Sequence, residues 1–140
     1  MNATLPAAAP AVPGVRPVTL TEPLPGFPQH RDYVLVAADG SGLLRWLQSV
    51  DPQGPRFLVV PPVPFVPTYA PRLPGAALTE LGLASAEEAE LFCLVTVPDG
   101  DVRAATANLR APLVVHPETG RARQVVLTEG GHPIRHALRR

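Results

Sequence analysis

Prolines constrain this chain more than any other residue type, because nineteen of them are spread over its 140 residues. A proline inside a helix removes a backbone hydrogen bond and clashes with the preceding turn, so it breaks or kinks the helix. The composition therefore argues against long helices and favours short strands that are joined by stiff turns. Eight prolines fall between Pro52 and Pro74, and such a segment is expected to follow a sheet edge or the surface.

Between the turns lie six or seven short apolar or β-branched runs, with turn signals about every ten residues. This spacing is typical of an antiparallel sheet curled into a barrel or sandwich, and too few helices exist for parallel crossovers. We therefore predict an all-β, mainly antiparallel, barrel-like single domain with one or two short helical turns. The expected strands are residues 18–21, 33–37, 44–50, 57–60, 91–97, 103–115 and 123–128.

The helical segments are expected to be short. Residues 76–81 read as a helix that Gly82 closes as a C-cap. Ser85 and Glu88 have the spacing of a capping box, which opens a single helical turn. Residues 132–138 are expected to form a turn or a short helix. Residues 39–42 read as a hairpin turn.

The N-terminal residues differ from the rest of the chain. Residues 1–17 are rich in Ala and Pro and show no hydrophobic periodicity, so we predict a disordered tail. The β-barrel domain is then expected to span residues 18–140.

Charge is balanced overall, with twelve Arg against twelve Asp plus Glu, but it is unevenly distributed. Residues 76–101 hold six acidic residues and no basic one, whereas residues 102–140 hold seven Arg and two Glu. Opposed patches of this kind can steer a charged partner. Charge clusters are more often simply solvated surface, and that reading stays open.

The sequence lacks a recognisable catalytic or metal-binding constellation. Ser49 and Asp51 are close in sequence, but no nucleophile elbow or associated base accompanies them. His132 and His136 are four residues apart, yet Pro133 lies between them and no third ligand is near. The late arginines lack a stacking motif, so direct nucleic-acid binding is not expected. We therefore expect no enzyme activity, no cofactor and no metal.

Cys93 is the single cysteine and lies in an apolar run, so a buried thiol is expected rather than a disulfide. No apolar run approaches the roughly 20 residues that span a bilayer, and the N-terminus lacks a signal-peptide pattern. We expect a cytoplasmic protein with no membrane contact.

A protein-binding module remains as the favoured class. Asn108 and Gln48 each offer both a donor and an acceptor, and Phe65 and Tyr69 lie in the proline-stiffened segment, where exposed aromatics bind at low entropic cost. Each residue has a structural alternative, in which Asn108 holds a turn and Gln48 satisfies backbone groups. For Trp46 we expect a place in the core.

The blocks WLQSVDP, RFLVVPPVPFVPTY, LTELGL, LVTVP, TANLRAPLVV and RQVVL, taken in this order, closely resemble the flagellar assembly factor FliW family. The resemblance runs from about Leu24 to Leu138. It implies a compact, mostly antiparallel β-barrel-like domain without enzyme activity. Proteins of that family bind flagellin in the cytoplasm. They also bind the translational repressor CsrA away from its RNA site, and so relieve repression of flagellin mRNA.

Under this resemblance the expected partners are flagellin and CsrA, and the free chain is expected to be a monomer. The residues expected to contact partners are Gln48, Phe65, Thr68, Tyr69, Glu87, Glu90, Thr106 and Asn108. Three features depart from the family: the usual N-terminal hairpin is replaced by the Ala/Pro tail, Thr68 stands where an acidic residue is frequent, and the chain is neutral overall. The alternative is a small-ligand-binding or re-purposed protein-binding barrel.

Overall fold

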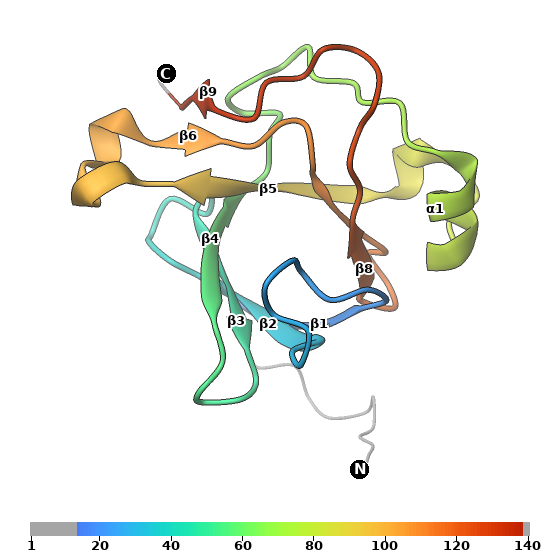
Figure 1. Ribbon diagram of the computed structural model, residues 1–140, viewed down its shortest axis with the longest axis horizontal. Helices are drawn as coiled ribbons and strands as arrows, with labels where there is room; N and C mark the ends of the chain where they lie inside the picture. Colours follow the sequence, from blue (N-terminus) through green and yellow to red (C-terminus); the bar gives the residue numbers. More distant parts are fainter. Residues whose placement is uncertain (1–13, 139–140) are drawn as a thin grey trace.

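The computed structural model describes residues 14–138, and seven of its strands close into a barrel (Figure 1). The strands pair in the order β4-β3-β2-β1-β8-β7-β5, and β5 pairs back with β4 to complete the ring. All neighbours are antiparallel except β1 and β8, which run parallel. The bounds are β1 Val15–Leu20, β2 Asp32–Ala37, β3 Arg45–Ser49, β4 Arg56–Val60, β5 Glu90–Thr96, β7 Leu113–Val115 and β8 Arg121–Gln124. The predicted fold class is confirmed.

Alternating residues of the strands fill the barrel, because successive side chains of a strand point to opposite faces. Tyr33 and Leu35 of β2 point inward and are fully buried, and the inward residues of its neighbours meet them. Phe27, from the turn before β2, packs edge-on against Phe57 at a ring-centroid distance of 5.2 Å. The core comprises Val18, Leu20, Leu24, Tyr33, Leu35, Leu47, Val59, Phe92, Leu113, Val115 and Ala122.

Two smaller apolar clusters lie outside the barrel. The helix α1 (Gly75–Leu81) buries Ala77 and Leu81 against β7 and the segment after β8. The second cluster lies beneath the proline-rich segment that follows β4, where Val60 and Cys93 of adjacent strands meet Leu109. The proline-rich segment therefore covers the outside of the barrel, as its composition predicted.

The start of the barrel corrects the predicted domain boundary. Strand β1 begins at Val15, so residues 15–17 belong to the sheet and not to a tail. Val15 pairs with Val36 and Val18 pairs with Tyr33, which makes β1 and β2 an antiparallel pair. Residues 15–17 of the predicted tail are therefore part of a strand. Residues 1–13 of the predicted tail lie outside the described residues.

The single strand expected over residues 103–115 is also wrong, because it is interrupted twice. A 3₁₀ turn, η3 (Val102–Ala104), precedes the short strand β6 (Thr106–Ala107), and a turn at Asn108 separates β6 from β7. The C-terminal segment forms neither turn nor helix at its end. It forms the strand β9 (His136–Ala137), which pairs with β6.

The helical predictions are partly confirmed. Gly82 closes α1 in the left-handed conformation, with φ of 75°, and its amide bonds back to the helix. The capping box at Ser85 does not form, since the Ser85 side chain makes no capping hydrogen bond to the 3₁₀ turn η1 (Ala86–Glu88). Glu88 instead accepts a hydrogen bond from the Ala84 amide at 2.9 Å. A third 3₁₀ turn, η2 (Pro98–Gly100), follows β5.

Candidate partner-binding surfaces

The structure does not gather the predicted contact residues into one site. Gln48 is exposed on the outer face of β3, while Glu87 and Glu90 flank the start of β5. Phe65, Thr68 and Tyr69 follow β4, and the Tyr69 hydroxyl reaches Leu109 in the turn that contains Asn108. Thr106 lies in β6, directly before that turn. The partner-binding role of these residues stays a prediction. Their local geometry shows which side chains are engaged within the chain and which could contact a partner.

Tyr69 is a half-buried anchor, which favours its structural alternative over an exposed contact. Its hydroxyl donates a hydrogen bond of 2.6 Å to the backbone carbonyl of Leu109, and its ring lies edge-on to His132. Burial raises the pKa of Tyr69 well above its usual value, so the hydroxyl remains a donor. Phe65 is likewise half-buried against the same cluster. Both rings hold the proline-rich segment onto the barrel.

Asn108 holds the turn between β6 and β7, as one of its two readings proposed. Its side-chain oxygen accepts hydrogen bonds from the Arg110 amide at 3.0 Å and the Ala111 amide at 3.1 Å. The backbone N–H of Asn108 donates to the Leu94 carbonyl and keeps the turn attached to β5. Because the side-chain oxygen is engaged, the amide NH₂ is the part of Asn108 with which a partner would bond.

The acidic run does not form one surface. Glu80 and Glu90 are engaged in ion pairs, the first with Arg123 at 2.5 Å and the second with Arg16 at 2.7 Å. The remaining acids divide between η1 at the start of β5 and η2–η3 beyond its end (Figure 1). Seven residues of strand separate these ends by about 23 Å. The six acidic residues of 76–101 therefore do not form one continuous patch.

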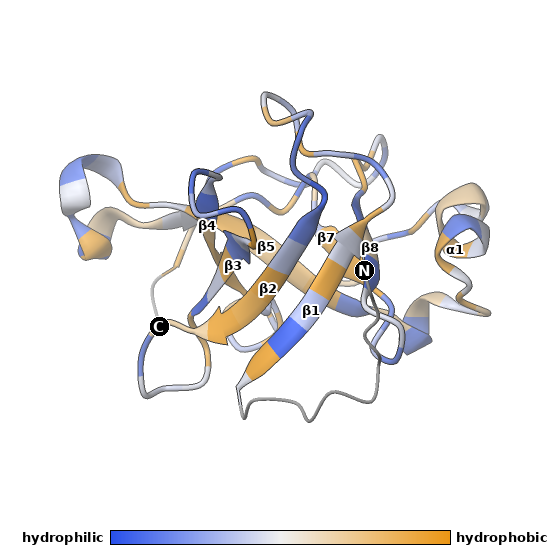
Figure 2. Ribbon diagram, turned by 90° about the horizontal axis from the view of Figure 1, so that it is seen from below, coloured by the Kyte–Doolittle hydropathy of each residue, from blue (hydrophilic) through white to orange (hydrophobic). Residues whose placement is uncertain are grey.

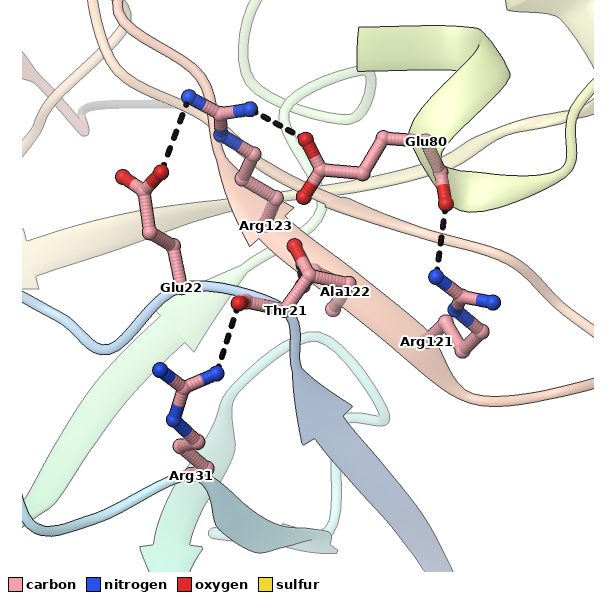
Figure 3. Close-up of polar contacts among 7 residues, drawn as sticks. All are labelled: Thr21, Glu22, Arg31, Glu80, Arg121, Ala122 and Arg123. Carbon is pink, nitrogen blue, oxygen red and sulfur yellow. Dashed lines mark hydrogen bonds and ion pairs between the residues drawn. The ribbon is translucent and has the colours of Figure 1, made fainter.

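The late arginines fix α1 to the barrel (Figure 3). Arg123 lies between Glu80 of α1 and Glu22, which follows β1, with its distance to the Glu22 carboxylate at 3.4 Å. Arg121 donates to the backbone carbonyl of Glu80 at 2.8 Å. Ala122 between them is fully buried, so Arg121 and Arg123 are the outward residues of β8, as predicted. Both arginines are therefore engaged in contacts within the chain.

His30 lies close to Ser49, a proximity that sequence reasoning missed. The Ser49 hydroxyl lies 3.3 Å from Nδ1 of His30 and accepts a hydrogen bond from the Asp51 amide. The Asp51 carboxylate accepts from the Gln53 amide and so does not orient His30. A Cβ atom at Gly54 would lie 2.4 Å from the Ser49 hydroxyl. The cluster therefore closes a tight turn around the buried Ser49 side chain. Within residues 14–138, no group of three His, Cys, Asp or Glu side chains could hold a metal ion.

An open apolar groove of about 250 Å³ lies at one end of the barrel, between the β2–β3 hairpin and the η2–η3 turns. Its lining is apolar except for Asp39 and Ser41, which bond to each other and shape the hairpin. Val102 is the most exposed apolar side chain of the lining, at 74%. The lining comprises Asp39, Ser41, Leu43, Leu44, Leu58, Phe65, Val95, Val97, Val102, Ala105 and Leu138.

An apolar row on the outside of the sheet leads into this groove. Val15, Val36, Trp46 and Leu58 are register partners on four adjacent strands, and each is half-buried. Their neighbours Leu35 and Leu47 are in the core, so the row points outward. Figure 2 shows β1, β2 and β3 side by side on this face, with apolar segments along β1 and β2.

Trp46 is therefore not a core residue, contrary to expectation. The Arg56 guanidinium lies 4.2 Å from the centre of its ring, a cation–π contact on the outer face. Tryptophan and arginine are enriched among the residues that dominate protein interfaces. The pair was missed because an apolar strand residue gives no sign of the face it occupies until the register is known.

No helix within residues 14–138 is long and apolar enough to cross a membrane. A family model described as FliW protein matches residues 9–138. The chain is 39% identical over 114 residues to a flagellar assembly factor FliW of Symbiobacterium thermophilum, covering 81% of this chain and 82% of that protein. A flagellar assembly factor FliW of Bdellovibrio bacteriovorus is 37% identical, covering 86% of this chain and 69% of that protein.

The fold is also similar to a solved structure. A crystal structure of the flagellar assembly factor FliW superposes with a TM-score of 0.78 at 29% identity, covering 87% of this chain and 84% of that chain. The family model, the relatives and the solved structure agree, and this chain belongs to the FliW family of flagellar assembly factors.

Proposed function

We propose that this chain is a non-enzymatic regulator of flagellum assembly that binds flagellin in the cytoplasm as a chaperone. When it is free of flagellin, it binds CsrA and relieves repression of flagellin mRNA translation. Membership of the FliW family carries this proposal. The apolar groove supports it, since an exposed apolar recess with few polar groups suits protein recognition better than catalysis.

Alternation between the two partners requires only linked binding equilibria. If flagellin and CsrA each lower the affinity of the chain for the other, flagellin that accumulates before export releases CsrA, and its export reverses the exchange. The affinities must be of comparable strength for the exchange to respond to flagellin concentration. The free chain is proposed to be a monomer, so that no second copy covers the surface that either partner uses.

Flagellin binding is tested by size-exclusion chromatography of the full chain with flagellin at micromolar concentration. A joint peak that carries both proteins is expected. Separate elution of the two proteins would contradict the chaperone role, since a complex that forms before export must survive at this concentration.

CsrA association is proposed to be steered by Glu87 and Glu88, the exposed acids of η1. Glu90 is removed from this role because Arg16 pairs with it. Replacing Glu87 and Glu88 by Arg should slow association with CsrA. Raising the salt concentration through 0.1 M, where the Debye length is about 10 Å, should slow the association of the parent chain with CsrA as well.

The matched control replaces Glu118 and Glu129 by Arg, which makes the same charge change at exposed residues elsewhere. Stopped-flow mixing should show slower association for the η1 variant than for the control. Equal rates in the two variants, or association that ignores salt, would show that CsrA approaches another surface.

A further inference from the structure

We propose that the groove and the apolar row beside it form one docking surface for an amphipathic helix that carries Lys or Arg next to its apolar face. The surface is defined by Val36, Trp46, Leu58, Val95, Val102 and Leu138. The inference rests on the proposed function, under which this helix belongs to flagellin. It adds where the partner binds and which chemistry the partner must present.

The row and the groove are continuous. Leu58 belongs to both, since it is the register partner of Trp46 and also lines the groove. Val59 pairs with Leu94 across β4 and β5, which sets Leu58 opposite Val95, another lining residue. Neighbouring strands lie about 4.8 Å apart, so the run from Val36 to Val95 spans about 14 Å before it reaches Val102.

The closed barrel selects a helix as the occupant. Strands β3 and β4 are paired on both edges, so an added strand would find no free backbone groups there. A helix satisfies its own backbone hydrogen bonds and binds through side chains alone. Its turns repeat every 5.4 Å, close to the spacing of strands, so a helix lying across the sheet sets about one apolar side chain over each strand.

Charge at the groove selects the flanking residues of that helix. Asp39 lines the groove, while Asp99 and Asp101 occupy the turns between the lining residues Val97 and Val102. Among the described residues of these turns, Arg103 is the one basic side chain; it lies 3.7 Å from Asp101 and is 92% exposed. Such an exposed pair leaves the acidic rim largely intact. Arg139 and Arg140, which follow Leu138, lie outside the described residues. A helix with Lys or Arg beside its apolar face complements the rim.

Trp46 supplies a direct probe, because it is the only tryptophan of the chain. Replacing it biosynthetically by 5-fluorotryptophan gives a single fluorine resonance in the middle of the row. Adding flagellin to the full labelled chain should shift or broaden this resonance, whereas CsrA should leave it in place. A resonance that ignores flagellin while a complex forms would overturn the proposal.

The matched variants are Val102→Asp and Val126→Asp. Both valines are exposed, at 74% and 63%, but Val126 follows β8 and does not line the groove. Val102→Asp should weaken flagellin binding by about tenfold or more, because a carboxylate enters an apolar contact beside an acidic rim. Val126→Asp should stay within about twofold of the parent, and both variants should keep the parent's melting temperature.

The outcomes distinguish the surface from the function. Equal binding by the parent and Val102→Asp would move flagellin to another surface while the proposed function stands. A parent chain that binds neither flagellin nor CsrA would remove the proposed function itself. Self-association that Val102→Asp abolishes would make a second copy the occupant, and loss of CsrA binding alone would make CsrA the occupant; either result overturns the proposal.

Discussion

The two tyrosines of this chain provide a matched test of what holds the proline-rich segment to the barrel. The Tyr69 hydroxyl donates to the Leu109 carbonyl at 2.6 Å. The Tyr33 hydroxyl is buried in the barrel core without a hydrogen-bond partner among the described residues. Replacing each by phenylalanine removes one oxygen atom and leaves the ring in place, so the two changes differ mainly in the hydrogen bond.

The two substitutions should change the melting temperature differently. Tyr69→Phe loses a hydrogen bond with a net contribution of about 1 kcal/mol, and the unpaired Leu109 carbonyl adds up to about 1 kcal/mol more. The melting temperature of a chain of this size changes by roughly 2–4 °C per kcal/mol, so that of the Tyr69→Phe variant should fall by roughly 2–8 °C. Tyr33→Phe removes an unsatisfied buried hydroxyl, so its melting temperature should stay unchanged or rise.

Thermal unfolding by circular dichroism, together with flagellin titration of each variant, decides the point. Tyr69→Phe should be less stable yet bind flagellin with unchanged affinity at a temperature where it is folded. A Tyr69→Phe variant of parent stability would refute the anchoring role. A stable variant that loses flagellin binding would return Tyr69 to the contact surface.

Three further changes have expected outcomes that follow from single residues. Gly82→Ala should lower the free energy of unfolding by about 1 kcal/mol in denaturant titrations, because Gly82 adopts φ of 75°. The control Gly75→Ala should not destabilise the chain, because the space around its Cβ is open. Equal losses of stability in the two variants would contradict this. Burial raises the pKa of the Cys93 thiol to about 12. The stability that its neutral form contributes is therefore complete below pH 9 and is lost as pH rises from 9 towards 12. Rapid labelling of the folded chain by a thiol reagent at pH 8 would show that the thiol is not buried. Deleting residues 1–13 should leave the melting temperature within a few degrees of the parent. Deleting residues 1–17 should lower it clearly, because Val15 pairs with Val36 of β2 and Arg16 forms an ion pair with Glu90. Equal melting temperatures in the two deletions would contradict the place of β1 in the sheet.

The barrel could be predicted because its signals are local. Turn residues mark the ends of β2, β3 and β4, and the alternation of each strand shows that one face is buried. The start of β1 was missed because Arg16 and Pro17 interrupt the apolar pattern, and only the Arg16–Glu90 pair across the barrel explains how a charged residue is accommodated there. The break at Asn108 falls at a polar residue, but its extent depends on the strand β9, which comes from about 30 residues further along the chain.

The candidate surface could not be predicted from the sequence because it depends on contacts between residues far apart in the chain. Trp46 and Leu58 are apolar strand residues like those of the core, and the sequence does not state which face each one occupies. Tyr69 carried the opposite ambiguity, since a tyrosine among prolines suits either an exposed contact or an anchor, and the Leu109 carbonyl decides it. Register and long-range hydrogen bonds, which connect residues far apart in sequence, supply the missing information.

The central claim is that one chain alternates between flagellin and CsrA, and a translation assay tests it most directly. A flagellin mRNA reporter that is repressed by CsrA in a cell-free system should be derepressed when this chain is added. Flagellin added next should restore repression by withdrawing the chain, with a midpoint set by the flagellin concentration. Translation that ignores the chain, or derepression that persists in excess flagellin, would contradict the account.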